Sequence, residues 1–502
     1  MVTNMEQKLL RIDSRDNAAV ALTDLAAGET VAVAGKTYQT AEAIPFGHKM
    51  ALTELAPGDT VIKYGCPIGH AVQAVQAGGW LHSHNVKTNL EGLLEYTYRP
   101  ARPAVADCAG LPDTFLGYPR ANGEAGTRNE LWIIPTVSCV NNTVERMAKA
   151  ARDRGLKAGD GVFAFPHNAG CSQLGDDFET TQRILASIVK HPNAGGVLLV
   201  SLGCENNDLE HFLPVLGDYD TRRIRTLVTQ DVEGDEVEAG LALMEEIAAQ
   251  MAGDRRTELP VSRLTLGFKC GGSDAFSGIT ANPLCGRISE FVTGLGGSAV
   301  LTEVPEMFGA EQQLMDRADS PETFDRVVEM INSFKEYYLR HKQPIYENPS
   351  PGNRRGGITT LEEKSLGCIQ KGGHAPVVDT LEMGQTCQKP GLSLMTGPGN
   401  DSVSVTNLLS SHAQLVLFTT GRGNPLGTAV PTVKIASNSA LFQRKRNWMD
   451  FNAGRVLEHG SVGPAAEELW QLVLDAASGR RQTRNEENGD REIMIFKDGV
   501  IL

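Results

Sequence analysis

The stretch Gly196-Val-Leu-Leu-Val-Ser-Leu-Gly-Cys-Glu-Asn-Asn207 joins a short apolar run to a glycine turn that carries a cysteine and polar side chains. Two further stretches have this form: Gly161-Val-Phe-Ala-Phe-Pro-His and Leu264-Thr-Leu-Gly-Phe-Lys. Apolar runs of this length, followed by Gly/Asn/Ser turns and then helical stretches, are typical of parallel α/β sheets. The sequence therefore predicts an α/β fold with cysteines at the carboxyl ends of three strands, namely Cys171, Cys204 and Cys270.

These three thiols are candidate metal ligands. Ligands of parallel sheets bind at the carboxyl ends of the strands, where the cysteines are expected to gather. Three soft thiolates at one edge suit iron, either as a cluster or as a single ion. The alternative is that each cysteine is a small buried apolar residue. The repeated strand–Gly–Cys arrangement with polar neighbours favours the metal interpretation.

Composition excludes several classes of protein. A chain of 502 residues is too long for one core and predicts roughly three domains. A net charge of −14 argues against non-specific nucleic-acid binding, and no stretch approaches 18 apolar residues, so no membrane span is expected. The first eight residues lack the apolar segment of a secretory signal. Nine cysteines without tight spacing predict reduced thiols in a cytoplasmic protein.

The organisation changes along the chain. Residues 9–95 alternate short strands with glycine turns, which predicts a small, mostly β module. Residues 96–127 contain four prolines and few apolar runs, and predict an extended linker. From Leu131 onward the pattern is that of βα repeats, with helices expected over 144–152, 177–190, 236–252, 321–340 and 464–478. The charged run from Arg480 to Arg491 is interpreted as a solvated surface segment.

The β module ends with a second candidate site. In His82-Ser-His84 the two imidazoles are two residues apart, so in an extended strand they face the same side and can chelate or flank one ligand. The alternative is a polar strand end at the surface. Asn85 and Lys87 follow in the same segment.

Other polar turns follow the predicted strands. Their glycines allow backbone N–H groups to point inward as an anion nest. No Walker loop, serine nucleophile elbow, kinase signature or His-Glu-x-x-His motif is present, and the three-glycine dinucleotide fingerprint is absent from the start of the sheet. The polar candidates are His167 beside Cys171, Asn206, Ser273 and Asp274, Glu303 to Glu306, Lys364 to Cys368, and Arg422.

Long runs of the chain include Val61-Ile-Lys-Tyr-Gly, Gly170-Cys-Ser-Gln-Leu-Gly-Asp-Asp, Leu202-Gly-Cys-Glu-Asn-Asn, Cys270-Gly-Gly-Ser-Asp, Leu301-Thr-Glu-Val-Pro-Glu-Met-Phe-Gly and Ile345-Tyr-Glu-Asn-Pro-Ser-Pro-Gly-Asn. Through these runs the chain resembles one family along nearly its whole length, the altronate dehydratase/galactarate dehydratase family. The resemblance implies an N-terminal β-clip module of the SAF type over 9–95, the linker 96–127, a middle α/β domain over 128–260, and a C-terminal Rossmann-like, mostly parallel α/β domain over 261–502.

The resemblance also implies an activity. Within the family the chain looks most like members of the hexuronate pathway, which dehydrate D-altronate to 2-dehydro-3-deoxy-D-gluconate. It implies dependence on Fe²⁺, with Mn²⁺ as an alternative, and on reducing conditions. Galactarate dehydration, elimination from another 2-hydroxy acid such as sulfolactate, and non-catalytic binding of a sugar acid stay open. A homodimer is expected.

We assign expected roles on this basis. The expected iron ligands are Cys171, Cys204, Cys270 and His82. The three cysteines hold a cluster with one open iron, or a single ion is held by His82, His84 and carboxylates while the cysteines lie around it as redox-sensitive groups. His84 or His167 acts as base or acid, and Lys87 is a further catalytic candidate. Lys87 and Arg422 are candidates for the substrate carboxylate. The remaining expected substrate contacts are Asn85, Asn206, Ser273 and Asp274.

Overall fold

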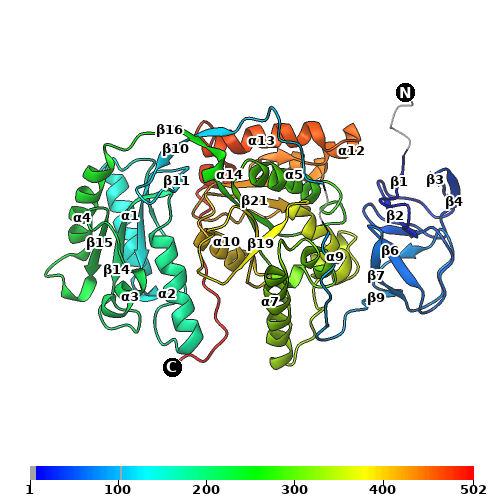
Figure 1. Ribbon diagram of the computed structural model, residues 1–502, viewed down its shortest axis with the longest axis horizontal. Helices are drawn as coiled ribbons and strands as arrows, with labels where there is room; N and C mark the ends of the chain where they lie inside the picture. Colours follow the sequence, from blue (N-terminus) through cyan, green and yellow to red (C-terminus); the bar gives the residue numbers. More distant parts are fainter. Residues whose placement is uncertain (1–6, 102–103) are drawn as a thin grey trace.

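The computed structural model describes residues 7–101 and 104–502. Residues 1–6, which belong to the segment in which no secretory signal was found, and residues 102–103 of the predicted linker lie outside the described residues. Figure 1 shows three parts in a row, with the N-terminal β unit at one end, the middle α/β unit at the other and the C-terminal α/β unit between them.

Over the described residues 7–101, the N-terminal unit contains nine short strands, which pair with one another in antiparallel fashion. In β3 buried and exposed residues alternate, as expected where one face of a strand packs on a core. The strands are β1 (Leu9–Leu10), β2 (Ala18–Ala21), β3 (Thr30–Val33), β4 (Lys36–Gln39), β5 (Lys49–Ala51), β6 (Thr60–Lys63), β7 (Cys66–Ala71), β8 (Trp80–Leu81) and β9 (Val86–Lys87).

A small antiparallel sheet follows the connection from this unit. It is formed by β10 (Thr114–Pro119), β11 (Ala125–Gly126) and β16 (Thr257–Pro260). Two of these strands lie within the stretch 96–127, where the sequence predicts an extended linker. Strand β10 pairs with β16 far along the chain, and such distant pairing leaves no local signal in the sequence.

The middle unit has a four-stranded parallel sheet in the order β13-β12-β14-β15. Helices α1 and α4 pack together on one face, and α2 and α3 cover the other. Helix α2 also packs against α10 of the C-terminal unit, so the two units share a hydrophobic core. The elements are β12 (Glu130–Pro135), α1 (Asn141–Asp153), β13 (Val162–Ala164), α2 (Gly175–Val189), β14 (Ala194–Ser201), α3 (Leu209–Leu216), β15 (Ile224–Val228) and α4 (Glu236–Met251).

The C-terminal unit is built on seven parallel strands in the order β19-β20-β18-β17-β21-β22-β23. The strands are β17 (Thr265–Cys270), β18 (Ser298–Leu301), β19 (Val377–Leu381), β20 (Gly391–Met395), β21 (Leu415–Thr420), β22 (Thr432–Ala436) and β23 (Phe451–Asn452). The helices are α5 (Ala281–Gly294), α6 (Glu311–Met315), α7 (Pro321–Arg340), α8 (Pro351–Arg355), α9 (Leu361–Cys368), α10 (Asp401–Ser410), α11 (Ser439–Arg444), α12 (Arg455–His459), α13 (Gly463–Ala477) and α14 (Arg484–Asn488).

Strand β17 is the point where the strand order of this sheet reverses. It is the first strand of the sheet along the chain, with β18 on one side and β21 on the other. Crevices that bind ligands form at such switch points, outside the carboxyl ends of the strands. The last residue of β17 is Cys270. Cys270 therefore lies where a ligand-binding crevice is expected in this sheet.

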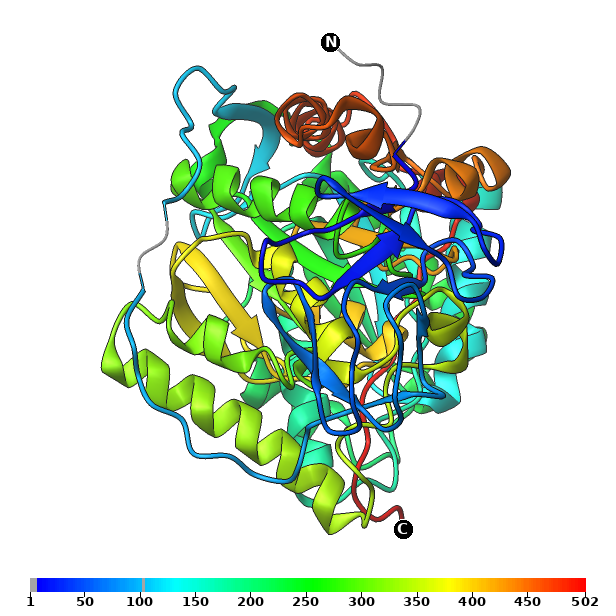
Figure 2. The ribbon, with the colours of Figure 1, turned by 90° about the vertical axis from the view of Figure 1, so that its right-hand side faces the viewer.

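The N-terminal unit packs onto the C-terminal unit. Figure 2 shows its strands in front of the C-terminal unit when the molecule is viewed from that end. Val61 and Ile68 of the N-terminal unit belong to the same hydrophobic cluster as Leu361 and Leu366 of helix α9. The element that carries Cys368 is therefore in contact with both units.

The charged run from Arg480 to Arg491 is only partly solvated, which corrects that interpretation in part: residues 480–482 and 487–489 are exposed, whereas Thr483 and Asn485 are buried. It contains helix α14, and Glu486 forms a buried ion pair with Arg128, with 2.7 Å between Glu486 Oε1 and Arg128 Nε. Arg491 pairs with the buried carboxylate of Glu130 at 2.9 Å. Charge density alone does not reveal burial when each charge has a partner elsewhere in the chain. Among the described residues, no helix is both long enough and apolar enough to cross a membrane.

Candidate metal centre

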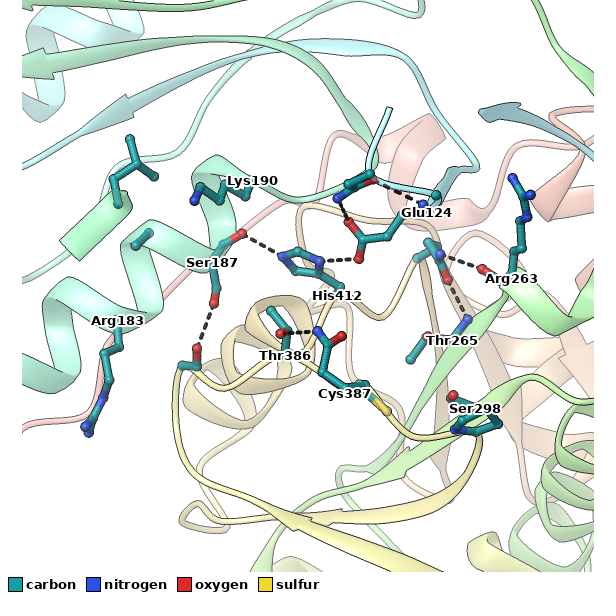
Figure 3. Close-up of a pocket in the computed structure, with 18 of the residues that line it drawn as sticks. Glu124, Arg183, Ser187, Lys190, Arg263, Thr265, Ser298, Thr386, Cys387 and His412 are labelled. Atoms are coloured by element: carbon teal, nitrogen blue, oxygen red, sulfur yellow. Dashed lines mark hydrogen bonds and ion pairs between the residues drawn. The ribbon is translucent and has the colours of Figure 1, made fainter. Parts of the chain in front are cut away.

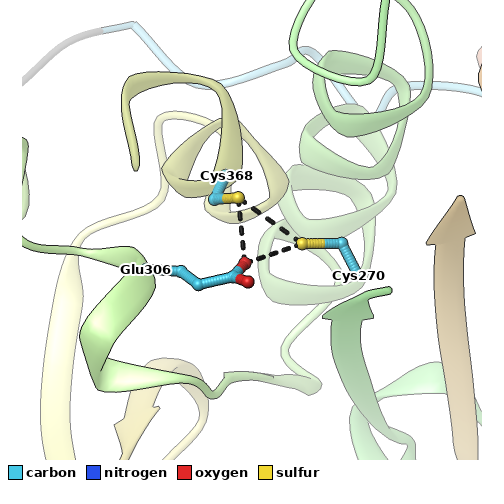
Figure 4. A group of neighbouring side chains, drawn as sticks. All are labelled: Cys270, Glu306 and Cys368. Carbon is cyan, nitrogen blue, oxygen red and sulfur yellow. Dashed lines mark hydrogen bonds between the residues drawn. The ribbon is translucent and has the colours of Figure 1, made fainter. Parts of the chain in front are cut away.

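Two thiols and one carboxylate meet at the carboxyl end of β17 (Figure 4). Cys270 ends β17, Cys368 ends α9, and Glu306 lies in a 3-10 turn (Val304–Glu306) after β18. Cys270 Sγ is 2.9 Å from Glu306 Oε2 and 3.4 Å from Cys368 Sγ. Cys368 Sγ is 3.0 Å from the same carboxylate oxygen. All three side chains are buried.

Three buried lysines surround this trio. Lys371 Nζ is 3.1 Å from Cys270 Sγ, and Lys364 Nζ is 2.7 Å from Glu306 Oε1. Lys269, the residue before Cys270, forms an ion pair with Glu303 at 2.7 Å. Buried lysine is rare unless it is paired. The lysines therefore indicate that the trio is built to carry negative charge.

The charges of the trio follow from these contacts. A hydrogen bond with Cys368 lowers the pKa of Cys270 to about 6, and the same hydrogen bond together with burial raises the pKa of Cys368 well above its ordinary value. Although burial alone raises it, Lys364 and Lys371 lower the pKa of Glu306 well below its ordinary value. At neutral pH the trio therefore holds a thiolate, a thiol and a carboxylate that share one proton.

The donor set fits a divalent metal ion. The three ligand atoms lie within 4.8 Å of one another, and among the described residues no other group of three or more His, Cys, Asp or Glu side chains does so. A cavity of about 600 Å³, lined in part by Cys270, Glu306 and Lys364, borders the trio. Three protein ligands beside an open cavity are the arrangement of a catalytic metal site, which leaves positions for water or substrate. Thiolate ligands favour iron or zinc over magnesium or calcium.

The N-terminal unit is fastened beside this centre by a buried ion cluster. Glu363, in the same helix as Cys368, accepts hydrogen bonds from Lys49 at 2.8 Å and from Lys63 at 2.7 Å. Although burial alone raises it, the two lysines lower the pKa of Glu363 to about 2. The cluster is therefore ionised at neutral pH and joins the two units.

Tyr64, at the tip of the β6–β7 hairpin, reaches into the same region. It lines a narrow cavity with Cys368 and Lys364, and its ring packs where Gly278 and Gly367 bring two segments together. A Cβ atom added at Gly278 would lie 2.4 Å from the Tyr64 hydroxyl and 2.7 Å from Gly367 Cα. Only glycine allows this close approach.

Replacing Gly278 with alanine is therefore expected to destabilise the protein by about 1–3 kcal/mol, because overpacking at a rigid contact forces the hairpin away. Urea unfolding of Gly278→Ala measures this cost. The control is Gly253→Ala, where no atom lies within 4 Å of an added Cβ. Equal stability of the two variants would contradict the close docking of Tyr64.

Cys171 and Cys204 are not brought to Cys270, and this corrects the expectation of one three-cysteine edge. They follow strands β13 and β14 of the middle sheet, whereas Cys270 ends a strand of the separate C-terminal sheet. Both are exposed, in contrast to Cys270. All three turns read alike in the sequence, because strand–turn–helix segments look the same whichever sheet they join.

The His-x-His segment lies on the N-terminal unit. His82 Nδ1 is 3.2 Å from Thr359 Oγ1, its ring stacks on Trp80, and burial lowers its pKa to about 3. His82 is therefore neutral, and it is not a member of the Cys–Glu–Cys trio. His84 is exposed beside Trp80, and Asn85 is buried in the turn, where it binds backbone atoms of residues 80 and 82.

Lys87 lies at the junction of the two units. It lines a cavity of about 660 Å³ together with Tyr346, Pro349, Arg354 and other residues. The adjacent residues 347 and 348 line the cavity at the metal trio. Lys87 is thus separated from the metal trio's cavity by the short segment 346–350.

Two expected site residues are engaged with the backbone of the middle unit. His167 Nε2 is 2.7 Å from the Pro135 carbonyl, and its Nδ1 accepts from the Ala169 N–H at 3.2 Å. Both ring nitrogens are therefore occupied, and burial lowers the pKa of His167 to about 4. Asn206 accepts from the Ser172 N–H at 2.7 Å.

The remaining expected contacts lie near β17. Ser273 is buried and its hydroxyl has no hydrogen-bond partner among the described residues. Asp274 binds Ser277 and Ser437, so its carboxylate is used to hold loops together. Arg422 is exposed, and its backbone N–H binds the Gly272 carbonyl at 2.9 Å. Of these residues, Ser273 has a free polar group, which is available to a ligand.

Sequence reasoning did not identify Glu306 and Cys368 as ligands. Both lie in polar segments that the sequence marks as unusual, but neither follows a strand with a cysteine-bearing glycine turn. The signal in the sequence that could have identified this site is the pair of lysines close to Cys368. Lys364 and Lys371 flank Cys368 at four and three residues in the sequence, and Lys371 contacts Cys270, whose thiolate its positive charge favours.

A further cavity of about 610 Å³ lies between the middle and C-terminal units (Figure 3). Glu124 binds His412 Nδ1 at 2.6 Å, and His412 Nε2 is 3.0 Å from the Ser187 carbonyl. Arg183, Lys190 and other residues complete the lining. No metal trio lies here among the described residues, so the cavity lacks the chemistry of the centre at Cys270.

Comparison with known proteins agrees with this organisation. Three family profiles match in succession: an altronate/galactarate dehydratase SAF domain over residues 7–89, a D-galactarate dehydratase/altronate hydrolase second domain over 117–252, and a D-galactarate/altronate dehydratase C-terminal domain over 261–501.

Full-length relatives match as well. An altronate dehydratase from Bacillus subtilis (strain 168) is 48% identical over 501 residues, covering 99% of this chain and 100% of the relative. An altronate dehydratase from Escherichia coli (strain K12) is 48% identical and covers 98% of this chain and 99% of the relative. A galactarate dehydratase (L-threo-forming) from the same organism is 32% identical, covering 98% and 97%. The chain belongs to the altronate/galactarate dehydratase family.

Proposed function

We propose that this chain dehydrates D-altronate to 2-dehydro-3-deoxy-D-gluconate at the Cys270–Glu306–Cys368 centre. The observation that carries the proposal is the buried trio of metal-ligand atoms beside a cavity at the switch point of the C-terminal sheet. The higher identity to the two altronate dehydratases than to the galactarate dehydratase supports the choice of substrate.

The metal proposed for this centre is Fe²⁺, held by Cys270, Cys368 and Glu306. Ligand atoms within 4.8 Å of one another suit a single ion. Mn²⁺ prefers oxygen and nitrogen ligands and is the weaker fit to two thiols. When bound, the ion supplies Lewis-acid stabilisation of the negative charge that develops when a proton is removed next to a carboxylate.

The buried lysines also stabilise the negative charge that develops on the substrate. Lys364 lines the cavity, and its ammonium contacts Glu306, Asn348 at 3.0 Å and Asn353 at 3.3 Å. A fixed cation at this position is placed to offset the second negative charge on the substrate carboxylate. The free hydroxyl of Ser273 is a further donor for a substrate hydroxyl or carboxylate.

The C2 proton requires a base, and we place it on the N-terminal unit. His84 is exposed in the segment 82–87, and Lys87 lines the cavity on the other side of the segment 346–350. His167 is the weaker candidate, because both of its ring nitrogens bind the backbone. Arg422 and Lys87 stay candidates for guiding the anionic substrate.

The proposal also covers the domain types, the cellular location and the oligomeric state. The reversal of strand order at β17 supports a Rossmann-like assignment for 261–502, and the antiparallel strands of the N-terminal unit support a β-clip assignment for 9–95. Nine free cysteines are consistent with a cytoplasmic enzyme. A homodimer is the proposed assembly.

The substrate assay is the direct test. The full chain is reduced and loaded with Fe²⁺ without oxygen, incubated with altronate, galactarate or sulfolactate, and analysed for the 2-keto product. We expect turnover of altronate by the iron-loaded protein and none by the metal-free protein.

The other outcomes separate the competing functions. Turnover of galactarate without altronate would replace the substrate but keep the chemistry. Release of sulfite from sulfolactate would indicate a different leaving group. Binding of altronate by calorimetry without product in any metal form would identify a non-catalytic binding protein and overturn the proposal.

A further inference from the structure

The middle unit presents a second group of thiols that the centre at Cys270 does not use. Of the nine cysteines, three are exposed: Cys139, Cys171 and Cys204. They follow β12, β13 and β14 in turn, and these strands are neighbours in the order β13-β12-β14. Adjacent strands lie about 4.8 Å apart. The three cysteine-bearing turns therefore lie next to one another at the carboxyl ends of these strands, where ligands of parallel sheets bind.

The three turns that carry these thiols are tied to one another. The Ser138 N–H donates to the Ala169 carbonyl at 2.9 Å, which joins the first turn to the second. The Asn207 N–H donates to the Gly170 carbonyl at 3.1 Å, which joins the third turn to the second. The Asn207 side-chain amide donates to the Thr136 carbonyl at 3.0 Å, which joins the third to the first. These three hydrogen bonds hold the cysteine-bearing turns together.

The two neighbours of Cys171 also hold its turn in place, one through close backbone contact and the other through a strained conformation. A Cβ atom at Gly170 would lie 2.1 Å from the Thr136 carbonyl oxygen, so only glycine fits beside Cys171. Ser172, on the other side of Cys171, has a φ of 59°, which is a left-handed conformation that non-glycine residues rarely adopt. Strain of this kind persists where the surroundings fix it, often at ligand sites.

The polar surroundings of the thiols favour anions. Helices α1, α2 and α3 begin at Asn141, Gly175 and Leu209, each within a few residues of one of the cysteines. Helix N-termini stabilise negative charge. Gln230 donates to Cys204 Sγ at 3.3 Å. Asn207 is fully buried, yet its Oδ1 atom has no partner among the described residues.

We propose that Cys139, Cys171 and Cys204 hold an iron–sulfur cluster, at a site separate from the Cys270 centre. Their thiols do not meet the 4.8 Å spacing that brings three ligands onto one ion, whereas a cluster spreads its cysteine ligands over several irons. Cysteine thiolates are the usual protein ligands of such clusters. In a four-iron cluster, which normally takes four cysteines, three cysteines leave one iron without a cysteine ligand. Because the thiols are exposed, that iron faces solvent and can take a small oxygen ligand such as a hydroxy acid or water.

Anaerobic reconstitution with Fe²⁺ and sulfide tests the proposal on the full chain. We expect acid-labile sulfide and the broad visible absorption of sulfide-to-iron charge transfer. Single substitutions Cys139→Ser, Cys171→Ser and Cys204→Ser are each expected to abolish both signals. Since all three residues are exposed, the variants are expected to keep their unfolding temperature. Cys387→Ser, a half-buried thiol elsewhere, is the control that keeps the signals.

The outcomes also separate this cluster from the proposed altronate dehydratase centre. Loss of sulfide and visible absorption in Cys270→Ser or Cys368→Ser, with retention in the three exposed-thiol variants, would overturn the proposal. Iron or zinc bound by the three thiols without sulfide would also overturn it, and would show a single-ion site instead. Failure of altronate turnover with the cluster signals intact would count against the proposed function alone.

Discussion

Cys270→Ser and Cys368→Ser are each expected to lower kcat for altronate at least about a hundredfold, since even the groups that merely orient metal ligands are worth about 10–100-fold. Serine keeps the size of cysteine but is a poor ligand for Fe²⁺ at neutral pH, because its hydroxyl does not ionise. Iron binding at the Cys–Glu–Cys trio is expected to fall with the activity. Glu306→Gln is expected to behave alike, since it removes the negative charge that two lysines stabilise.

The measurement is iron content alongside the initial rate of 2-keto acid formation. Cys285→Ala is the matched control, since Cys285 is a buried thiol outside the trio. It is expected to keep its iron and to retain activity close to that of the parent chain. Full activity in Cys270→Ser and Cys368→Ser with unchanged iron would remove the proposed centre.

Glu363→Gln is expected to destabilise the folded chain by about 3–5 kcal/mol, because it leaves two buried lysines without their counter-ion. Lys49 and Lys63 are both fully buried, and Glu363 is the carboxylate that pairs with each of them. The effect is expected to fall on the contact between the N-terminal and C-terminal units. The variant is therefore expected to become sensitive to proteolysis in the connection between the β unit and strand β10.

Urea unfolding gives the free-energy change, and limited proteolysis locates it. The control Glu336→Gln changes an exposed glutamate of helix α7 and is expected to stay within about 0.5 kcal/mol of the parent. If Glu363→Gln matched this control in both measurements, the buried ion cluster would not be what joins the two units.

Local signals predicted individual elements well. Helix α7 spans Pro321–Arg340, the range expected from the sequence, because Ser320 caps its first turn, Pro321 stands at its first position and the apolar residues recur at helical spacing. The strands before Cys204 and Cys270 were predicted for a similar reason. Each is a short apolar run closed by glycine.

The assignment of strands to sheets was not predictable in the same way. The turns at Cys171, Cys204 and Cys270 look alike, yet the first two belong to one sheet and the third to another. Cys139 was missed, because no glycine marks its turn. A local pattern indicates where a strand ends, but not which strand lies beside it.

Local sequence patterns were enough to predict an α/β protein with a mostly β unit at its N-terminus and a strand that leads into Cys270. Apolar periodicity and turn residues act over a few neighbours, so a single segment is enough to show them. Only the tertiary structure placed Glu306 and Cys368 beside Cys270, across separations of 36 and 98 residues. Their association depends on strand order and on buried lysines that offset their charge.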